Sequence, residues 1–183
     1  MSGWSPRAGT GTFSRQLQSI NYNKSNYLLG FNDDNKLILL DRRGLSKWSV
    51  DNLPDMPQDF SVVKLKNDVL CLNASALQLE EIAWDGNDQI KPLVDAANSF
   101  VATAVSDSAY LYFFSTINSL RAYDAEGTFK GSVGLKDATI SAIKPVKIQG
   151  AKYLSVRDES KERLLLYNID LQPPGQITIK NTT

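Results

Sequence analysis

The sequence predicts an all-β fold built from four similar units of about 42 residues each. Two observations predict it: an internal repeat runs along the chain, and short β-rich segments alternate with turn residues without a helical apolar stripe. The chain has 183 residues, of which 42% are hydrophobic, so it is long enough to bury a substantial core.

The repeat is clearest between residues 27–50 and 110–133. These segments, YLLGFNDDNKLILLDRRGLSKWSV and YLYFFSTINSLRAYDAEGTFKGSV, are identical at 10 of 24 positions without a gap. Weaker copies give four anchors spaced by 42, 41 and 43 residues, at Tyr27, Val69, Tyr110 and Tyr153. We therefore predict a single domain, residues 1–183, with units at approximately 13–55, 56–97, 98–138 and 139–183.

Each unit contains three strand-like segments in the same order, followed by a variable outer segment. The first segments are residues 18–25, 61–68, 101–108 and 144–151. The anchor segments are residues 27–31, 69–73, 110–114 and 153–157, and the third segments are residues 36–40, 80–84, 119–123 and 163–167. A repeat of this length with three or four antiparallel strands is typical of a β-propeller blade.

The segment "DRRG", Asp41 to Gly44, has the charges of an anion-binding site, but the repeat predicts a turn. Asp41 and Gly44 recur as Asp124 and Gly127, whereas the two arginines become alanine and glutamate. Asp bonds its own backbone in such connections, and Gly adopts positive φ at the last position. We expect related turns at "DGND" (85–88) and "NIDL" (168–171).

The outer segments and the number of units are compatible with more than one arrangement of the propeller. Pro54 and Pro57 suit an outer edge or a crossing between blades, and the alternating residues 176–180 could complete the first blade. Four blades are the minimum that closes a ring. The chain is therefore a closed four-bladed ring, part of a larger propeller, or half of a ring completed by a second copy; we favour a partial propeller.

The segments "NKLILLDRRG" and "NSLRAYDAEG" resemble blades of bacterial PQQ-like and YVTN-like propellers. In those families a hydrophobic strand leads into a similar Asp-x-x-Gly turn. The resemblance extends over all four units, with the motif clean in two of them. It implies a propeller architecture but no specific activity, and no cofactor or metal site of the quinone-dependent dehydrogenases can be placed on this chain.

The composition excludes several kinds of chemistry. Histidine is absent, which removes Ser-His-Asp triads, Cys-His dyads and His-ligated metals. Cys71 lies between two leucines, so we interpret it as a core residue. Asp33 and Asp34 in "NDDNK" lack the spacing of a calcium loop and are interpreted as part of a hairpin. No spacing nominates a pair of catalytic carboxylates.

Two kinds of aromatic position carry structural or functional hypotheses. Trp48 and Trp84 fall near the third turn of units one and two. They are the candidate binding anchors, for a sugar or a protein. The alternative is that they pack between blades. Tyr27, Tyr110 and Tyr153 occupy equivalent repeat positions. We expect these tyrosines to form one repeated layer between blades.

These observations favour a non-catalytic scaffold that binds a protein or another macromolecule through its loop rims, or that self-associates. The alternatives are a carbohydrate- or cell-envelope-binding module and a hydrolase with carboxylates in the channel. A formal charge of zero argues against nucleic acid, and no apolar run is long enough to span a membrane. The chain lacks an apolar leader at its start, so we expect a cytoplasmic protein or a trimmed periplasmic or cell-envelope one.

Overall fold

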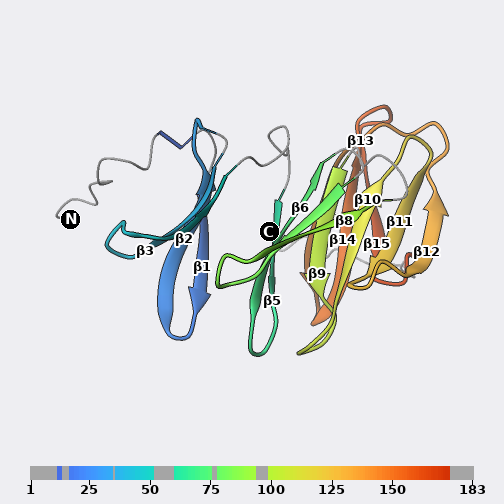
Figure 1. The fold of residues 1–183 in the computed structure, drawn as a ribbon. Helices are drawn as coiled ribbons and strands as arrows, with labels where there is room; N and C mark the ends of the chain where they lie inside the picture. Colours follow the sequence, from blue (N-terminus) through green and yellow to red (C-terminus); the bar gives the residue numbers. More distant parts are fainter. Residues whose placement is uncertain are drawn as a thin grey trace, which may run out of the picture.

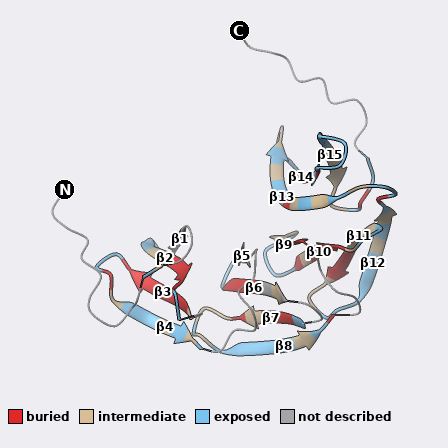
Figure 2. Cartoon of the chain, turned by 90° about the horizontal axis from the view of Figure 1, so that it is seen from above, coloured by how far each residue is buried: buried red, intermediate tan, exposed pale blue. Residues whose placement is uncertain are grey.

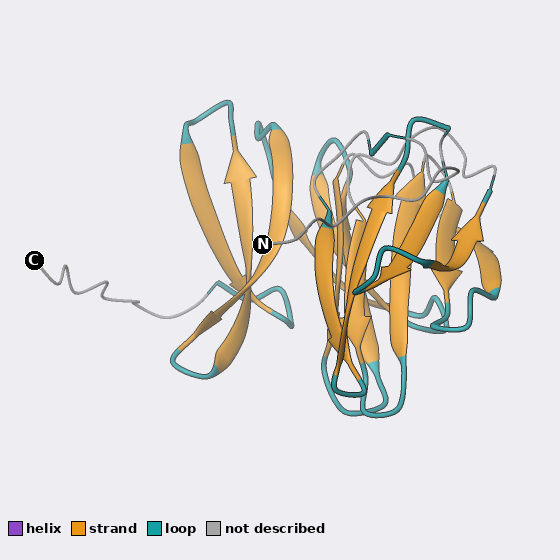
Figure 3. Cartoon of the chain, turned by 90° about the vertical axis from the view of Figure 1, so that its left-hand side faces the viewer, coloured by secondary structure: helices purple, strands orange, loops and turns teal. Residues whose placement is uncertain are grey.

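The computed structural model describes residues 12–13, 17–34, 36–51, 60–75, 78–93 and 99–173. Within these ranges the chain forms fifteen β-strands and no helix (Figure 3), which confirms the predicted all-β class. No helix that could cross a membrane occurs among them. The predicted terminal strand at residues 176–180 lies outside the described residues, as do Pro54 and Pro57.

The strands form four antiparallel sheets, which we call blades 1 to 4, each wound in chain order from its first strand to its last. Blade 1 contains β1 (Gln18–Tyr22), β2 (Ser25–Phe31), β3 (Leu37–Asp41) and β4 (Ser46–Val50). Blade 2 contains β5 (Phe60–Lys64), β6 (Val69–Ser75), β7 (Gln78–Ile82) and β8 (Asp88–Pro92). Blade 3 contains β9 (Ser99–Ala104), β10 (Tyr110–Ser115), β11 (Ser119–Asp124) and β12 (Phe129–Gly134). Blade 4 contains β13 (Ile140–Ile148), β14 (Ala151–Asp158) and β15 (Arg163–Asn168).

The blades follow one another around a common axis in the manner of a β-propeller (Figures 1 and 2). The first strand of each blade lies on the inner side, and β4, β8 and β12 lie on the outer side. Seen from above, the four blades form an arc that is open between blade 1 and blade 4 (Figure 2). The arrangement matches the predicted partial propeller more closely than a closed four-bladed ring.

Alternate side chains of the central strands face different neighbours, as the period of two in a strand requires. In β6, Val69 and Cys71 pack toward blade 1, whereas Leu70 and Leu72 pack toward blade 3. The described residues therefore form three apolar clusters, one between each pair of consecutive blades. The buried position of Cys71 confirms its interpretation as a core residue.

All four blades share one turn geometry after the third strand. The backbone N–H of the first turn residue donates to the carbonyl of the fifth residue. The N–H of the fourth residue donates to the carbonyl of the first, and all these distances are 2.8–3.1 Å. The fourth residue has positive φ each time: Gly44 (77°), Gly86 (89°), Gly127 (82°) and Leu171 (60°). The interpretation of "DRRG" as a turn is confirmed. In blade 2 the turn begins at Ala83, two residues before the predicted "DGND".

The acidic residue of this turn works as a backbone acceptor. Asp41 Oδ1 accepts the N–H groups of Arg43 and Leu45 at 2.8 and 3.0 Å, and the Arg43 guanidinium reaches Asp41 Oδ2 at 3.2 Å. These hydrogen bonds, that from Leu45 first, lower the pKa of Asp41 against the opposing effect of desolvation. Arg43 therefore binds the Asp of its own turn.

The predicted common layer of tyrosines is wrong. Tyr27 of blade 1 packs toward blade 2 and meets the Trp84 ring at a centroid distance of 4.8 Å. Tyr110 also packs toward blade 2, but from blade 3, so it uses the opposite face of its blade. Tyr153 pairs across the sheet with Val146 and alternates with Leu154, which faces blade 3. Tyr153 therefore lies on the face of blade 4 that points away from blade 3.

The cause is a one-residue difference in register. The turn residue Asp41 pairs with Tyr27 in blade 1, whereas the equivalent Asp124 pairs with Leu111 in blade 3. A slip of one residue moves a side chain to the other face of a sheet. The gap-free sequence alignment therefore matched residues of β3 and β11 that face the same way. It matched residues of β2 and β10 that face opposite ways.

Blade 4 contains a buried carboxylate that the sequence did not reveal. Asp158 is fully buried, whereas the other residues of the segment "RDESKER" (157–163) are exposed. It accepts hydrogen bonds from the Ser160 hydroxyl at 2.6 Å, Arg163 Nε at 2.9 Å and the Thr139 N–H at 3.1 Å. The Ser160 hydroxyl contributes most to lowering the pKa of Asp158 to about 2.

Replacing Gly127 with alanine should lower the free energy of unfolding by roughly 1–2 kcal/mol, because an added Cβ disfavours the left-handed region. The new Cβ would meet only the Tyr112 hydroxyl, at 3.8 Å, so the loss is conformational rather than steric. Gly134→Ala is the matched control, since nothing lies within 4 Å there and its φ is not positive. Urea denaturation measures both, and equal losses would contradict the assigned turn.

Asp158→Asn should weaken the acid sensitivity of the fold. The pKa of Asp158 is about 2 in the folded protein and ordinarily 3.8. Ionised Asp158 therefore stabilises the fold fully at pH values above 3.8. This contribution disappears as the pH falls through the folded pKa. Thermal unfolding from neutral pH to pH ~2 should therefore show a lower stability at pH 7 and a shallower acid slope for the variant. Parallel curves for the two proteins would argue against this role.

Candidate binding surface

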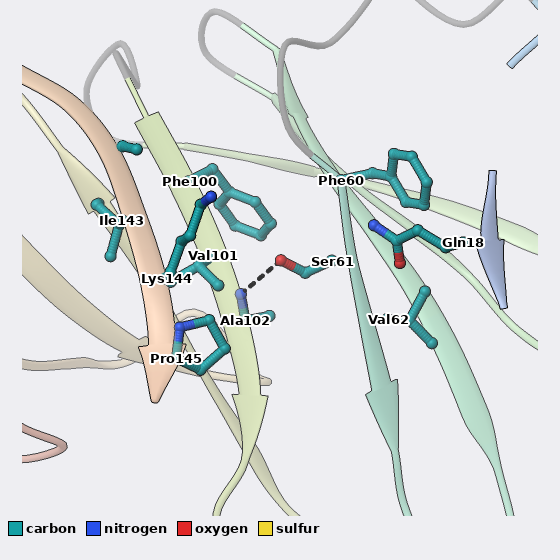
Figure 4. Close-up of a pocket in the computed structure, with 11 residues that line it drawn as sticks. Gln18, Phe60, Ser61, Val62, Phe100, Val101, Ala102, Ile143, Lys144 and Pro145 are labelled. Carbon is teal, nitrogen blue, oxygen red and sulfur yellow. Dashed lines mark hydrogen bonds between the residues drawn. The ribbon is translucent and has the colours of Figure 1, made fainter. Parts of the chain in front are cut away.

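The inner strands of the four blades line a hollow of about 320 Å³ (Figure 4). Its size falls at the lower end of the range of small ligand sites. The lining residues come from β1, β5, β9 and β13, and they are Gln18, Phe60, Ser61, Val62, Phe100, Val101, Ala102, Ala142, Ile143, Lys144 and Pro145. Because these are the first strands of their blades, one backbone edge of each faces the inner side of the arc.

Two features leave fewer backbone N–H groups unpaired at these inner edges. The Ser61 hydroxyl of β5 accepts the backbone N–H of Ala102 in β9 at 3.0 Å, which joins blades 2 and 3 beside the hollow (Figure 4). Pro145 in β13 has no N–H to leave unpaired, as is typical of proline in an edge strand. The floor of the hollow is thus fixed by backbone and small side chains.

The chemical character of the hollow is apolar with one positive charge. Phe100 and Ile143 are buried in its wall, and Phe60 is half-buried. Lys144 is the single charged residue among the eleven that line it, and its side chain extends alongside Phe100 (Figure 4). This combination suits an apolar group that carries or adjoins an acidic group. None of the eleven lining residues is a carboxylate.

The two candidate anchors, Trp48 and Trp84, lie together between blades 1 and 2. The indole N–H of Trp48 donates to the backbone carbonyl of Trp84 at 2.8 Å. The Trp84 ring contacts Tyr22 and Tyr27 at centroid distances of 4.7 and 4.8 Å. Both tryptophans are partly buried and neither lines the hollow. These contacts account for the two residues through packing between blades, while their role as binding anchors stays a prediction.

A polar cluster between blades 2 and 3 was not anticipated. The Tyr110 hydroxyl donates to the Glu81 carboxylate, which also binds Lys91 Nζ at 2.8 Å. Lys91 Nζ donates in addition to the Ala125 carbonyl of blade 3 at 2.9 Å. Burial, followed by the Glu81 carboxylate, raises the pKa of Tyr110. No motif could reveal this cluster, because its members lie on three different strands and meet only after the blades pack.

The part of the chain that the structure describes contains no group of three acidic, Cys or His side chains arranged to hold a metal. Asp33 and Asp34 instead belong to the β2–β3 connection, as expected. There the buried Asn32 side chain accepts the N–H groups of Asp34 and Lys36 at 3.1 and 2.9 Å. The connection is therefore organised by the Asn32 side chain.

Comparison with known proteins adds evidence on the fold alone. No protein-family model matches the sequence, and no curated protein matches it. A structure described as BBS1N in complex with ARL6DN aligns with 85% of this chain and 50% of that chain, at a TM-score of 0.65 and 16% identity. A protein of unknown function from Bacteroides caccae aligns with 86% of this chain and 65% of that chain, at a TM-score of 0.52 and 11% identity.

This chain therefore spans half of the first structure and about two thirds of the second. Both identities are too low to indicate a shared function. With the four blades, the likeness identifies the fold as β-propeller-like.

Trp48→Phe should lower the free energy of unfolding by about 1 kcal/mol, because it removes the indole donor to the Trp84 carbonyl while keeping an aromatic ring. Trp84→Phe keeps the accepting carbonyl and an aromatic ring, and only reduces the ring contact with Tyr22 and Tyr27. Chemical denaturation followed by circular dichroism measures both. Unchanged stability in both variants, together with loss of glycan binding, would instead assign the pair to a ligand.

Proposed function

We propose that the protein is a non-catalytic propeller scaffold that binds a protein partner. The observation that carries the proposal is the hollow on the inner strands, which is assembled from residues of all four blades. A surface of this kind depends on the arrangement of the blades rather than on one loop. Its apolar wall and Lys144 favour a partner segment with an apolar side chain next to an acidic one.

The contacts between blades support this proposal because they hold the hollow in one shape. Ser61 links β5 to β9 beside the hollow, and the backbone N–H of Lys66 donates to the Asp107 carbonyl at 2.8 Å between the turns of blades 2 and 3. A pre-organised surface loses less entropy on binding than a flexible one. The similar structure described as a complex of BBS1N with ARL6DN is an example of this fold bound to a protein.

The other two candidate functions have less support. A carbohydrate module would need exposed aromatic faces, but Trp84 is covered by two tyrosine rings. A hydrolase of the predicted kind would need carboxylates facing the channel, and the described lining residues offer none. We also propose, from the turn motif alone, that the scaffold belongs among bacterial propellers of the PQQ-like and YVTN-like kind.

A charge reversal in the hollow tests the proposal. Lys144→Glu should reduce the recovery of the partner at least tenfold in affinity capture from cells of the source organism, read by quantitative mass spectrometry. Lys147→Glu is the matched control, because Lys147 is also an exposed lysine of β13 but does not line the hollow. Thermal unfolding checks that both variants fold. Equal recovery with the two variants, or no protein above background with the wild type, would refute the proposal.

A further inference from the structure

Blade 4 has a sheet face that no other blade covers. Leu154, Val156, Leu165 and Tyr167 pack toward blade 3, so the residues that alternate with them point the other way. Cross-strand pairing places these residues in three rows: Ala142, Arg157 and Leu164; Lys144, Ser155 and Leu166; and Val146, Tyr153 and Asn168. We call this surface the open face of blade 4. Leu164 is 67% exposed there, and Tyr153, Leu166 and Val146 are half-buried.

The corresponding face at the other end of the arc is covered. In blade 1, Ile38 and Leu40 are buried although no blade precedes them. A Cβ on Gly30 would lie 2.4 Å from the Leu17 side chain and 3.1 Å from that of Phe13, so residues before β1 lie over this end. Blades 2 and 3 are covered on both faces by their neighbours. Among the described blades, only blade 4 has a sheet face over which no other described segment packs.

The fold indicates what kind of surface fits there. Every covered interface between described blades is one sheet face packed on another. The four blades form an open arc (Figure 2) and correspond to half of a similar chain. Two such arcs contain eight blades, which lies within the usual range of four to eight. A second copy of this chain would contribute four further blades to such a ring.

The charges on the open face favour contact with one end of the second copy over the other. Two open faces in contact would bring Arg157 and Lys144 of both copies together, which is repulsive. Arg157 lies next to the β14–β15 turn, on the rim that carries the β2–β3 turn in blade 1. At that turn Asp33 and Asp34 are exposed. We propose that the open face of blade 4 docks against the blade 1 end of a second copy, on the half-buried Phe13 and Leu17 that lie over blade 1, with Arg157 near these aspartates, so that two copies close one ring.

Sedimentation velocity over a wide protein concentration range tests this assembly. The wild type should form a dimer. Leu164→Arg should raise the dissociation constant at least tenfold, and because Leu164 is largely exposed the variant should fold normally. Ile90→Arg is the matched control, since Ile90 is 58% exposed on β8 of blade 2. A wild type that stays monomeric, or equal effects of the two substitutions, would overturn the proposal.

A charge swap separates this contact from other modes of association. Arg157→Glu should weaken the dimer by repulsion from Asp33 and Asp34, and Asp33→Lys with Asp34→Lys should restore it. Recovery in the combined variant supports the head-to-tail contact, whereas a dimer insensitive to both changes contradicts it. These measurements change no residue that lines the hollow and use no captured partner, so the dimer can be refuted while the proposed binding of a partner stands.

Discussion

The alternation of side chains along the central strand of each blade is the constraint on which this structure depends. Residues of β6 alternate between the core shared with blade 1 and the core shared with blade 3, so both faces of blade 2 are apolar. The same holds for β10, where Phe113 and Phe114 are both fully buried but belong to different clusters. A sheet buried on both faces needs a neighbour on each side. The chain meets this need by winding its blades side by side around an axis.

Polar contacts fix how each blade meets the next. Between blades 1 and 2 the indole of Trp48 binds the Trp84 carbonyl, and the Tyr22 hydroxyl binds the Asn67 carbonyl at 2.9 Å. Between blades 2 and 3 Lys91 binds the Ala125 carbonyl, and between blades 3 and 4 Lys152 binds the Ala104 carbonyl. In each case a side-chain donor meets a backbone carbonyl of the adjoining blade. Apolar packing therefore supplies the adhesion, and these donors supply the alignment that shapes the hollow.

The sequence predicted the architecture well because the repeat carries it. Asp41, Gly44, Asp124 and Gly127 predicted the shared turn, since a positive φ at the fourth position favours glycine. Leu171 hides the same position in blade 4, where its buried side chain packs in the core despite a φ of 60°. The prediction of a common tyrosine layer was wrong because a one-residue difference in hairpin register moves the side chains of a strand to the other face of the sheet without changing its composition. The hollow and the Glu81 cluster arise from contacts between distant segments, which no local pattern encodes.

The central claim is that blade 1 and blade 2 pack face to face with Tyr27 directed toward blade 2. Nuclear Overhauser effects between aromatic protons test it most directly. The account predicts cross-peaks between the rings of Tyr27 and Trp84, whose centroids lie 4.8 Å apart, and between those of Phe31 and Phe60, at 5.3 Å. Absence of both cross-peaks in the folded protein, or contacts from Tyr27 to blade 3 instead, would contradict the packing of the blades.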